Sequence, residues 1–303
     1  MNKNFFYKKK ILITGIDGFV GSNLAKKLVF VGAKVSGIIQ KKNKKSLFNY
    51  EKINKKCTLY KGDIYNNNFI RKIINNNKFE IIFHLAAQVE VGVANYDPFD
   101  TWESNIRGTY TILNNLVKNK NIKSVIVASS DKSYGEYPKK YLPYKESYLS
   151  KAIYPYDVSK ACADMISKSY SSKLFNLPII TTRFANIYGP GQLHFSALIP
   201  DIMKSLITGK KFIPRGNGND IRDYVFIDDI VDVYLILSKK LYKNPNLKGE
   251  VFNAGTNKQH KVREIVKKFY VINNQVKEYQ EILKKMKNKK TIGEINNQFM
   301  DYS

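Results

Sequence analysis

The chain contains little cysteine and histidine, and it has no long apolar run. Its 303 residues include two cysteines, Cys57 and Cys162, and three histidines. These give neither a disulfide framework nor zinc-ligand spacing, so no metal site is predicted. Apolar runs such as 11–14 and 125–128 are far shorter than the roughly 20 residues of a membrane-spanning helix. Asp17 interrupts the apolar residues after the basic N-terminus, which argues against a signal peptide. These absences predict a cytoplasmic protein without a membrane partner.

Arginine is scarce in a strongly basic chain. The formal net charge is +26, yet only six of the 51 lysine and arginine residues are arginine. Proteins that grip phosphate backbones and bases usually rely on arginine, because its planar guanidinium can form two parallel hydrogen bonds. Lysine instead rises together with asparagine and isoleucine, as in segments 41–45 and 66–68, which is typical of codon bias at solvated positions. We therefore predict no nucleic-acid partner, and the charge would favour a small anionic substrate.

Apolar segments of strand length alternate with amphipathic helical patterns. The predicted strands are 10–14, 34–39, 58–61, 81–84, 123–128, 179–184 and 250–253. The predicted helices are 20–31, 67–74, 101–117, 154–175, 196–208 and 228–241. This alternation predicts an α/β fold with a doubly wound parallel sheet covered on both faces. We expect a dinucleotide-binding domain over residues 1–185 with a returning segment 226–256. A smaller cap would comprise 186–225 and 257–303, and segment 41–56 is predicted to be a surface excursion.

Three glycines follow the first predicted strand and open the first helix. Gly15, Gly18 and Gly21 have the spacing G-x-x-G-x-x-G. Glycines there permit a tight turn and a close approach of the backbone to a pyrophosphate, which faces the positive end of the helix. An ordinary glycine loop is the alternative, but the position between the first strand and the first helix favours a dinucleotide site.

The adenosine end of such a site lacks its usual acidic residue. A carboxylate often lies about 20 residues after the glycine turn, where it binds the ribose, but this chain has Gln40 followed by Lys41 and Lys42. Gln40 would bond a ribose hydroxyl, whereas either lysine would favour a 2′-phosphate, so NAD and NADP both stay open. Asp63, after the third strand, suits an adenine contact. His84 is expected to pack within the protein and not to catalyse.

Tyr156 and Lys160 lie four residues apart, so they share one face of a helix. A tyrosine hydroxyl has a pKa of about 10, and a neighbouring ammonium favours the phenolate and lowers that pKa. Ser130 would hold a substrate hydroxyl in line. The trio suits removal of a proton from an alcohol while a hydride leaves its carbon for a nicotinamide. An exposed Tyr/Lys helix face is the alternative in a chain so rich in both residues.

Together these motifs resemble the extended short-chain dehydrogenase/reductase family, specifically the nucleotide-sugar epimerases and dehydratases. The likeness runs from residue 10 to residue 257 and includes segments 104–109, 183–191 and 222–229. It implies a Rossmann-type domain with a substrate-binding cap, and NAD as cofactor with NADP as the alternative. It casts Tyr156 as the base, Lys160 as its partner and ribose ligand, and Ser130 as the hydroxyl anchor. Asn186 and Arg222 fall where the family contacts the nucleotide diphosphate.

The cofactor-binding residues that the resemblance and the motifs imply form one set. They are Gly15, Asp17, Gly18, Phe19, Val20, Gly21, Gln40, Asp63, Ile64, Leu85, Ala86, Ala87, Asn105, Tyr156 and Lys160.

The pair Asp131-Lys132 after Ser130 is similar to that of the CDP-glucose 4,6-dehydratases, whereas family epimerases usually carry small residues there. In such a dehydratase, oxidation at C4 acidifies the C5 proton. The resemblance casts Lys132 as the base that removes this proton, with a pKa below about 10. Asp131 would be the acid that protonates the departing C6 hydroxyl, and burial would raise its pKa. The hydride then returns to C6.

Two alternatives remain. Gln192 after Gly191 is typical of an epimerase, so a nucleotide-sugar 4-epimerase is the second hypothesis. Family members usually continue some tens of residues past a segment like 298–303, so the cap is expected to be truncated. The third hypothesis is therefore an inactive dinucleotide-binding sensor or scaffold. By analogy with the family we also expect a homodimer through helices that flank the active-site helix.

Overall fold

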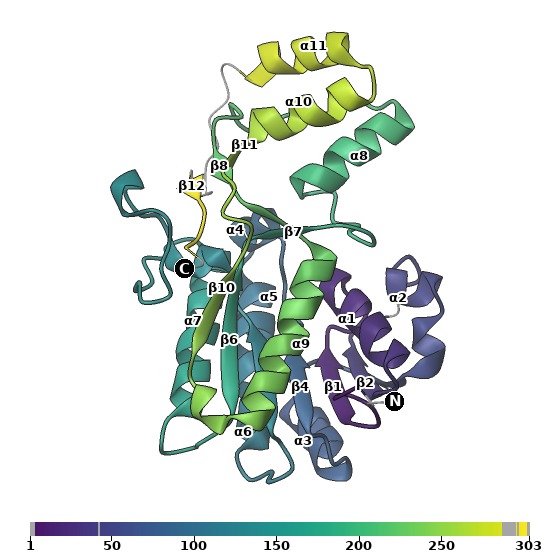
Figure 1. Ribbon diagram of the computed structural model, residues 1–303, viewed down its shortest axis with the longest axis vertical. Helices are drawn as coiled ribbons and strands as arrows, with labels where there is room; N and C mark the ends of the chain where they lie inside the picture. The colour runs from purple at the N-terminus through teal and green to yellow at the C-terminus, as the bar shows by residue number, and fades with distance from the viewer. Residues whose placement is uncertain (1–3, 42, 287–294, 296, 302–303) are drawn as a thin grey trace.

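The computed structural model describes residues 4–41, 43–286, 295 and 297–301, and a seven-stranded parallel sheet runs through its lower half (Figure 1). The strands, in sheet order, are β3 (Thr58–Lys61), β2 (Lys34–Ile39), β1 (Lys10–Thr14), β4 (Ile81–His84), β5 (Ser124–Ala128), β6 (Ile179–Phe184) and β10 (Val251–Ala254). All seven predicted strands are present within one residue of their predicted bounds. Because the strand order reverses direction beside β1, the sheet is doubly wound in the Rossmann manner, as predicted.

Each face of the sheet is covered by helices. Ile11 and Ile13 of β1 pack into one apolar core with α1 (Phe19–Phe30) and α9 (Ile227–Lys243). Leu12 of the same strand packs into a second core with α3 (Asn67–Asn76) and α6 (Gly108–Leu116). Alternate residues of one strand thus enter opposite cores, which explains why the strands are apolar without interruption.

The remaining helices of this part of the molecule are shorter or border the site. They are α2 (Leu47–Tyr50), α4 (Val91–Tyr96), α5 (Phe99–Thr101) and α7 (Pro155–Ser171), with 3₁₀ turns at Ile53–Lys56, Asp131–Tyr134, Lys139–Tyr141 and Pro245–Leu247.

One local prediction is wrong, and one predicted helix is present with a local variation. Segment 41–56 is more than a surface excursion, because Phe48 and Ile53 are buried in the core beside α1. The predicted helix 101–117 is also not uniform, because a π-helical segment, Trp102–Arg107, precedes α6. The burial of Phe48 and Ile53 depends on long-range packing, which the local sequence pattern does not show.

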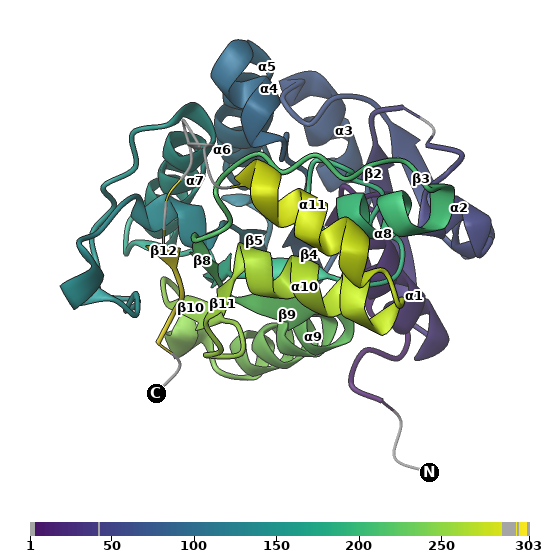
Figure 2. The ribbon, with the colours of Figure 1, turned by 90° about the horizontal axis from the view of Figure 1, so that it is seen from above.

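A smaller lobe lies over the carboxyl ends of the strands (Figures 1 and 2). It contains α8 (Leu198–Thr208), α10 (Val262–Ile272) and α11 (Val276–Met286), with a three-stranded sheet of β11 (His260–Lys261), β8 (Ile221–Arg222) and β12 (Asn297–Gln298). A two-stranded parallel sheet, β7 (Asn186–Tyr188) with β9 (Tyr224–Phe226), connects the lobe to the large sheet. Ile202, Val266 and Ile282 belong to a third apolar core, which holds the three helices together.

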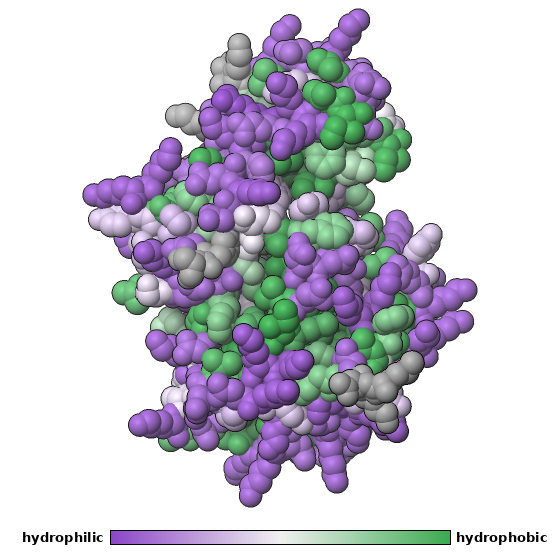
Figure 3. Space-filling view, in the orientation of Figure 1, coloured by the Kyte–Doolittle hydropathy of each residue, from purple (hydrophilic) through white to green (hydrophobic). Residues whose placement is uncertain are grey.

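The surface is largely hydrophilic. Figure 3 shows hydrophilic side chains over most of one face, with apolar side chains gathered near α8 and α10 and over the middle of the large sheet. Ile207 of α8 and Ile272 of α10 are among the exposed apolar residues. Within the described ranges, no helix combines the length and apolarity needed to cross a bilayer.

Candidate active site

A cavity of about 780 Å³ separates the carboxyl ends of the strands from the smaller lobe. Every residue in the predicted catalytic, cofactor-binding and substrate-binding sets lines it, except Asn105. Lys41, offered as an alternative 2′-phosphate contact, does not line it either. The lining residues from that set are Gly15, Asp17, Gly18, Phe19, Val20, Gly21, Gln40, Asp63, Ile64, Leu85, Ala86, Ala87, Ser130, Asp131, Lys132, Tyr156, Lys160, Asn186 and Arg222. Residues far apart in the sequence are therefore brought to one hollow.

The glycine turn forms a cradle that only glycine allows. Gly15 has φ +68°, and a Cβ there would lie 2.9 Å from the Cα of Ala86. A Cβ on Gly21 would lie 2.1 Å from the carbonyl oxygen of Gly15. Helix α1 begins after Gly18 without a side-chain cap and without an acidic residue in its first turn. The positive helix end is thus left to a ligand, and a pyrophosphate fits it.

At the carboxyl ends of β2 and β3, beside the glycine turn, two predicted adenosine contacts bond to each other. The amide Nε2 of Gln40 donates to Oδ1 of Asp63 at 2.7 Å. Within the cradle, burial raises the pKa of Asp17, and bonds from backbone amides oppose that shift. Lys42, which the sequence offered as a 2′-phosphate contact, lies outside the described residues.

Asn105 lies behind the cavity wall, because it is the buried residue of the π-helical segment Trp102–Arg107. Its Oδ1 accepts from the backbone nitrogen of Gln88 at 2.8 Å, and its Nδ2 donates to the Gln88 carbonyl at 2.9 Å. The same Nδ2 lies 2.9 Å from Oγ of Ser159. Asn105 therefore supports the loop after β4, whose residues line the cavity, and does not line it itself.

His84 is a packed histidine, as predicted. Its two ring nitrogens lie 2.8 Å from Oγ1 of Thr14 and 3.1 Å from Oγ1 of Thr109. Burial, assisted by the charge of Lys160, lowers the pKa of His84 to about 3, so its ring stays neutral. Among the described residues, no group of three or more His, Cys, Asp and Glu side chains is placed to hold a metal ion.

Tyr156 and Lys160 lie on α7 and face the cavity, but their electrostatics differ from the prediction. Burial, then the charge of Asp131, raises the pKa of Tyr156 above its usual range, and a hydrogen bond with Ser130 opposes this only partly. Lys160 contributes little, because its Nζ donates to the carbonyl of Ala128 at 2.9 Å and lies 5.9 Å from the centre of the Tyr156 ring. Burial also lowers the pKa of Lys160, to about 8. The prediction that Lys160 lowers the pKa of Tyr156 is therefore wrong for the protein alone, because desolvation exceeds the attraction.

Ser130, Asp131 and Lys132 form the start of a 3₁₀ turn after β5. Ser130 caps the turn by accepting from the backbone nitrogen of Lys132 at 3.3 Å, and its hydroxyl donates to Oδ1 of Asp131 at 3.0 Å. Asp131 is only 5% exposed. Burial raises its pKa, while Lys132, the Ser130 bond and Arg222 act against the rise. The direction is the one that an acid for the C6 hydroxyl requires.

A largely buried ion pair between Arg183 and Asp164 packs against this turn and stabilises it. Nε of Arg183 on β6 lies 2.5 Å from Oδ2 of Asp164 on α7, and its guanidinium lies 4.5 Å from the centre of the Tyr134 ring. Tyr134 ends the 3₁₀ turn that Asp131 begins. The strand, the helix and the acid-bearing turn are thus held in one arrangement.

The lobe contributes polar groups from β7 and β8. Asn186 donates to the carbonyl of Asp223 at 3.1 Å, and Arg222 is 6% exposed. Both line the cavity, as expected for contacts with a diphosphate.

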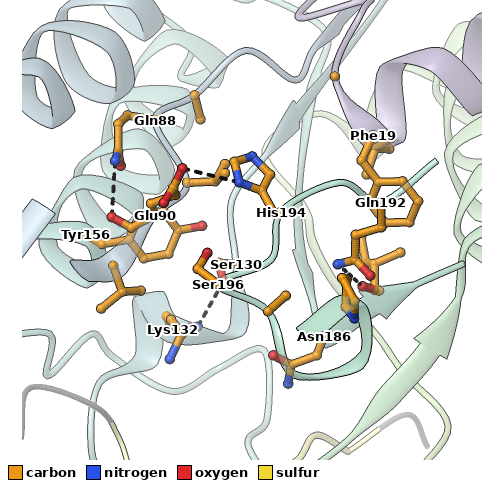
Figure 4. A pocket seen from close by; sticks show the side chains of 18 of the residues that line it. Phe19, Gln88, Glu90, Ser130, Lys132, Tyr156, Asn186, Gln192, His194 and Ser196 are labelled. Carbon is orange, nitrogen blue, oxygen red and sulfur yellow. Dashed lines mark hydrogen bonds and ion pairs between the residues drawn. The ribbon is translucent and has the colours of Figure 1, made fainter. Parts of the chain in front are cut away.

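Sequence analysis missed a histidine–carboxylate contact and an arginine in the cavity wall. Nδ1 of His194 lies 3.3 Å from Oε1 of Glu90. Figure 4 shows the two side chains pointing toward each other in the cavity wall. No sequence signal joins two residues so far apart. Arg215 also lines the cavity and donates to the carbonyl of Ser196 at 2.6 Å. It lies in the loop 214–218, whose proline and two glycines indicate a turn and carry no signal of a binding site.

Comparison with known proteins finds similarity to sugar-nucleotide 4,6-dehydratases. Residues 12–302 match the family described as GDP-mannose 4,6 dehydratase. A dTDP-D-glucose 4,6-dehydratase of Dictyostelium discoideum is 34% identical over 88% of the chain and 63% of that protein, so the chain spans less than two thirds of this relative. A CDP-glucose 4,6-dehydratase of Salmonella typhimurium is 30% identical over 85% of the chain and 72% of that protein.

Solved structures agree with this result. A dTDP-glucose 4,6-dehydratase of Bacillus anthracis in complex with NAD superposes with a TM-score of 0.82 and 27% identity, covering 97% of this chain and 88% of that one. A UDP-glucose 4-epimerase of Thermotoga maritima gives a TM-score of 0.80 and 25% identity, covering 97% and 90%. The sequence resemblance is thereby confirmed, and the chain belongs to the GDP-mannose 4,6-dehydratase family.

Proposed function

We propose that the protein is an NAD-dependent nucleotide-sugar 4,6-dehydratase, with CDP-glucose as the first candidate substrate. One observation carries the proposal: a single cavity joins the glycine cradle to a buried carboxyl group, Asp131, whose pKa is raised. A 4-epimerase needs no such acid, because it eliminates no water. The dehydratases from Dictyostelium and Salmonella support the same reaction class.

The cradle of Gly15, Gly18 and Gly21 would hold the pyrophosphate of NAD, and the pair Gln40–Asp63 would meet its adenosine. NAD supplies an acceptor that takes a hydride from the sugar and later gives it back. Gln40 has no negative charge to repel a 2′-phosphate, so NADP stays the alternative; the Bacillus structure in complex with NAD favours NAD.

Substrate oxidation would begin at Tyr156. In the protein alone this residue keeps its proton at neutral pH, so we propose that it becomes a base only when the cavity is filled. Ser130 would hold the C4 hydroxyl beside it. Lys160, whose Nζ lies against the Ala128 carbonyl, would bond the cofactor ribose.

Elimination would follow at the 3₁₀ turn. Lys132 would take the C5 proton, which the neighbouring C4 ketone acidifies, and Asp131 would give its proton to the departing C6 hydroxyl. Water leaves, the hydride returns to C6, and Lys132 gives a proton back to C5. Sugar and cofactor thus end with no net change of redox state, and the product is a 4-keto-6-deoxy sugar nucleotide.

The smaller lobe would bind the nucleotide. Arg222 and Asn186 would bond the diphosphate, since a guanidinium matches its geometry. In this proposal residues 1–185 and 226–256 form the cofactor domain, and 186–225 and 257–303 form the substrate cap. We also propose a cytoplasmic location and a homodimer.

The proposal is tested by incubating the purified protein and NAD with CDP-, dTDP- and UDP-glucose and GDP-mannose, with the 4-keto-6-deoxy product identified by mass and by its absorbance in alkali. Asp131→Asn should slow product formation by about 10²–10⁴-fold while C4 oxidation still reduces the cofactor. Asp97→Asn, which replaces an acid outside the cavity lining, is the matched control.

Three results separate the hypotheses. Conversion to a C4 epimer, with tolerance of Asp131→Asn, would establish the epimerase that the Thermotoga likeness and Gln192 suggest. Binding of NAD with no turnover of any sugar nucleotide would establish the inactive sensor or scaffold. Loss of product alone in Asp131→Asn supports the dehydratase.

A further inference from the structure

Gln298 reaches the catalytic turn from near the C-terminal end of the described chain. It lies in β12 and is fully buried. Its Oε1 accepts a hydrogen bond from Nζ of Lys132 at 3.2 Å, whereas its Nε2 is buried and has no hydrogen-bond partner among the residues that the structure describes. Because an ammonium can only donate, this contact fixes which end of the amide faces Lys132.

The sheet of the cap explains how Gln298 arrives there. Strand β12 runs parallel to β8, with Gln298 opposite Arg222 (Figure 1). Opposite residues of neighbouring strands project to the same face. Arg222 lines the cavity and acts electrostatically on Asp131, so this face of the small sheet looks toward the acid–base pair.

Neighbouring residues hold β12 firmly. Phe299 and Met300 are buried. The carbonyl of Phe299 accepts from the backbone nitrogen of Tyr144 at 3.0 Å. The Tyr144 ring in turn stacks on Tyr134, the last residue of the catalytic 3₁₀ turn, with the ring centres 4.7 Å apart. Strand β12 and the catalytic turn are therefore packed through a shared aromatic pair, and the position of Gln298 relative to Lys132 is set by rigid elements.

The contact matters because Asp131 and Lys132 are adjacent and would attract each other directly if both were ionised. Their interaction lowers the pKa of Asp131, yet no ion pair between them is formed within 4.0 Å among the described residues. A direct pair would stabilise the carboxylate further and remove the acid that the elimination needs. The neutral amide oxygen of Gln298 can hold the amine of Lys132 away from Asp131. Unlike a carboxylate, it adds no negative charge beside that amine.

We infer that Gln298 is a positioning residue that holds the amine of Lys132 away from Asp131, so that the two act as separate base and acid on C5 and C6. The inference deepens, and rests on, the proposed dehydratase function. It assigns a role in the elimination step to a residue that does not line the cavity.

The test compares Gln298→Met, which keeps approximate volume but removes the acceptor, with Ile295→Val. Ile295 is buried in the same part of the chain, so the second variant measures the cost of disturbing that segment. Thermal unfolding and NAD titration of both variants report whether the fold and the cofactor site persist.

Turnover then separates positioning from bulk structure. Gln298→Met should lower kcat about 10- to 100-fold, below the full contribution of an acid–base group, with KM within about twofold. Incorporation of solvent deuterium at C5 should fall by the same factor. Reduction of the cofactor in a single turnover should keep its rate, because C4 oxidation does not use Lys132. Equal losses of C4 oxidation and elimination would overturn the inference and leave a structural role alone.

A second measurement does not depend on turnover. Lys132 is methylated reductively in wild type and both variants, and its rate is followed by peptide mass spectrometry relative to the other lysines. Gln298→Met should change the Lys132 rate several-fold, and Ile295→Val should not. If wild type makes no 4-keto-6-deoxy sugar but the Lys132 rate still changes, the proposed function fails and the contact stands. An unchanged Lys132 rate sinks the inference whatever the activity.

Discussion

Replacement of Gly21 by alanine tests the glycine cradle most directly. The added Cβ would lie 2.1 Å from the Gly15 oxygen and 2.9 Å from the Gly15 carbonyl carbon and the Ile16 Cα. Ordinary van der Waals contact begins near 3.4 Å, so the first turn of α1 must move by more than an ångström from β1. All the close atoms belong to the backbone, and no side chain can rotate away. Overpacking of this kind costs about 1–3 kcal/mol of folding free energy.

The movement should also weaken NAD binding. The pyrophosphate is expected to contact the backbone at the start of α1, and a displaced helix end loses those bonds. A loss of 1.4 kcal/mol, about one charge-assisted hydrogen bond, raises the dissociation constant roughly tenfold, so we expect at least that factor.

Two other glycines give a graded comparison. A Cβ on Gly18 would meet only the Gly15 oxygen, at 3.2 Å, which requires a shift of a few tenths of an ångström. A Cβ on Gly92, in helix α4, meets no atom within 4 Å, so Gly92→Ala should stabilise the fold by about 0.5–1 kcal/mol. Urea unfolding should therefore rank the free energy of unfolding, from highest to lowest, as Gly92→Ala, wild type, Gly18→Ala and Gly21→Ala. Calorimetric NAD titration should show the largest loss of affinity in Gly21→Ala. Wild-type stability and NAD affinity in Gly21→Ala would refute the reasoning.

Two further predictions concern the residues on α7. Tyr156→Phe removes one hydroxyl, so NAD binding should persist while cofactor reduction by the sugar nucleotide falls about 10²–10⁴-fold; unchanged single-turnover absorbance would contradict the assignment. The pKa of Lys160 is about 8 in the folded protein against its ordinary 10.5, so between these values the unfolded chain binds the additional proton and stability rises with pH. The unfolding free energy of wild type relative to Lys160→Met should increase by on the order of 3 kcal/mol from pH 8 to 10.5, and a constant difference would show that the amine is not desolvated.

Much of the large sheet could be predicted because its strands are buried on both faces. Ile11 and Leu12 enter opposite cores, which leaves an uninterrupted apolar signal in the sequence. The strands of the cap carry no such signal. Strands β8, β11 and β12 contain two residues each, and they exist only because segments distant in the chain meet. The placement of Gln298 was therefore beyond local reasoning.

The site divides in the same way. Glycine spacing and the four-residue interval on α7 are local, and they placed Gly21 and Tyr156 at the cavity. The pKa of Tyr156 depends on burial of its side chain, which is a tertiary property, and the predicted direction of its shift was wrong. Asn105 does not line the cavity, because it is buried in a π-helical segment and bonds to Gln88; this placement also depends on tertiary packing.

The strand interface between Phe299–Asp301 and Tyr144 has a consequence for how the molecule opens. The amide of Tyr144 donates to Phe299, and the amide of Asp301 donates back to the Tyr144 carbonyl at 2.9 Å. Solvent can reach neither amide unless the two segments part, so both protons should exchange through one cooperative opening event. The same event would detach the chain end that carries Gln298, so the lifetime of this closed pairing sets an upper limit on how long the elimination machinery stays assembled.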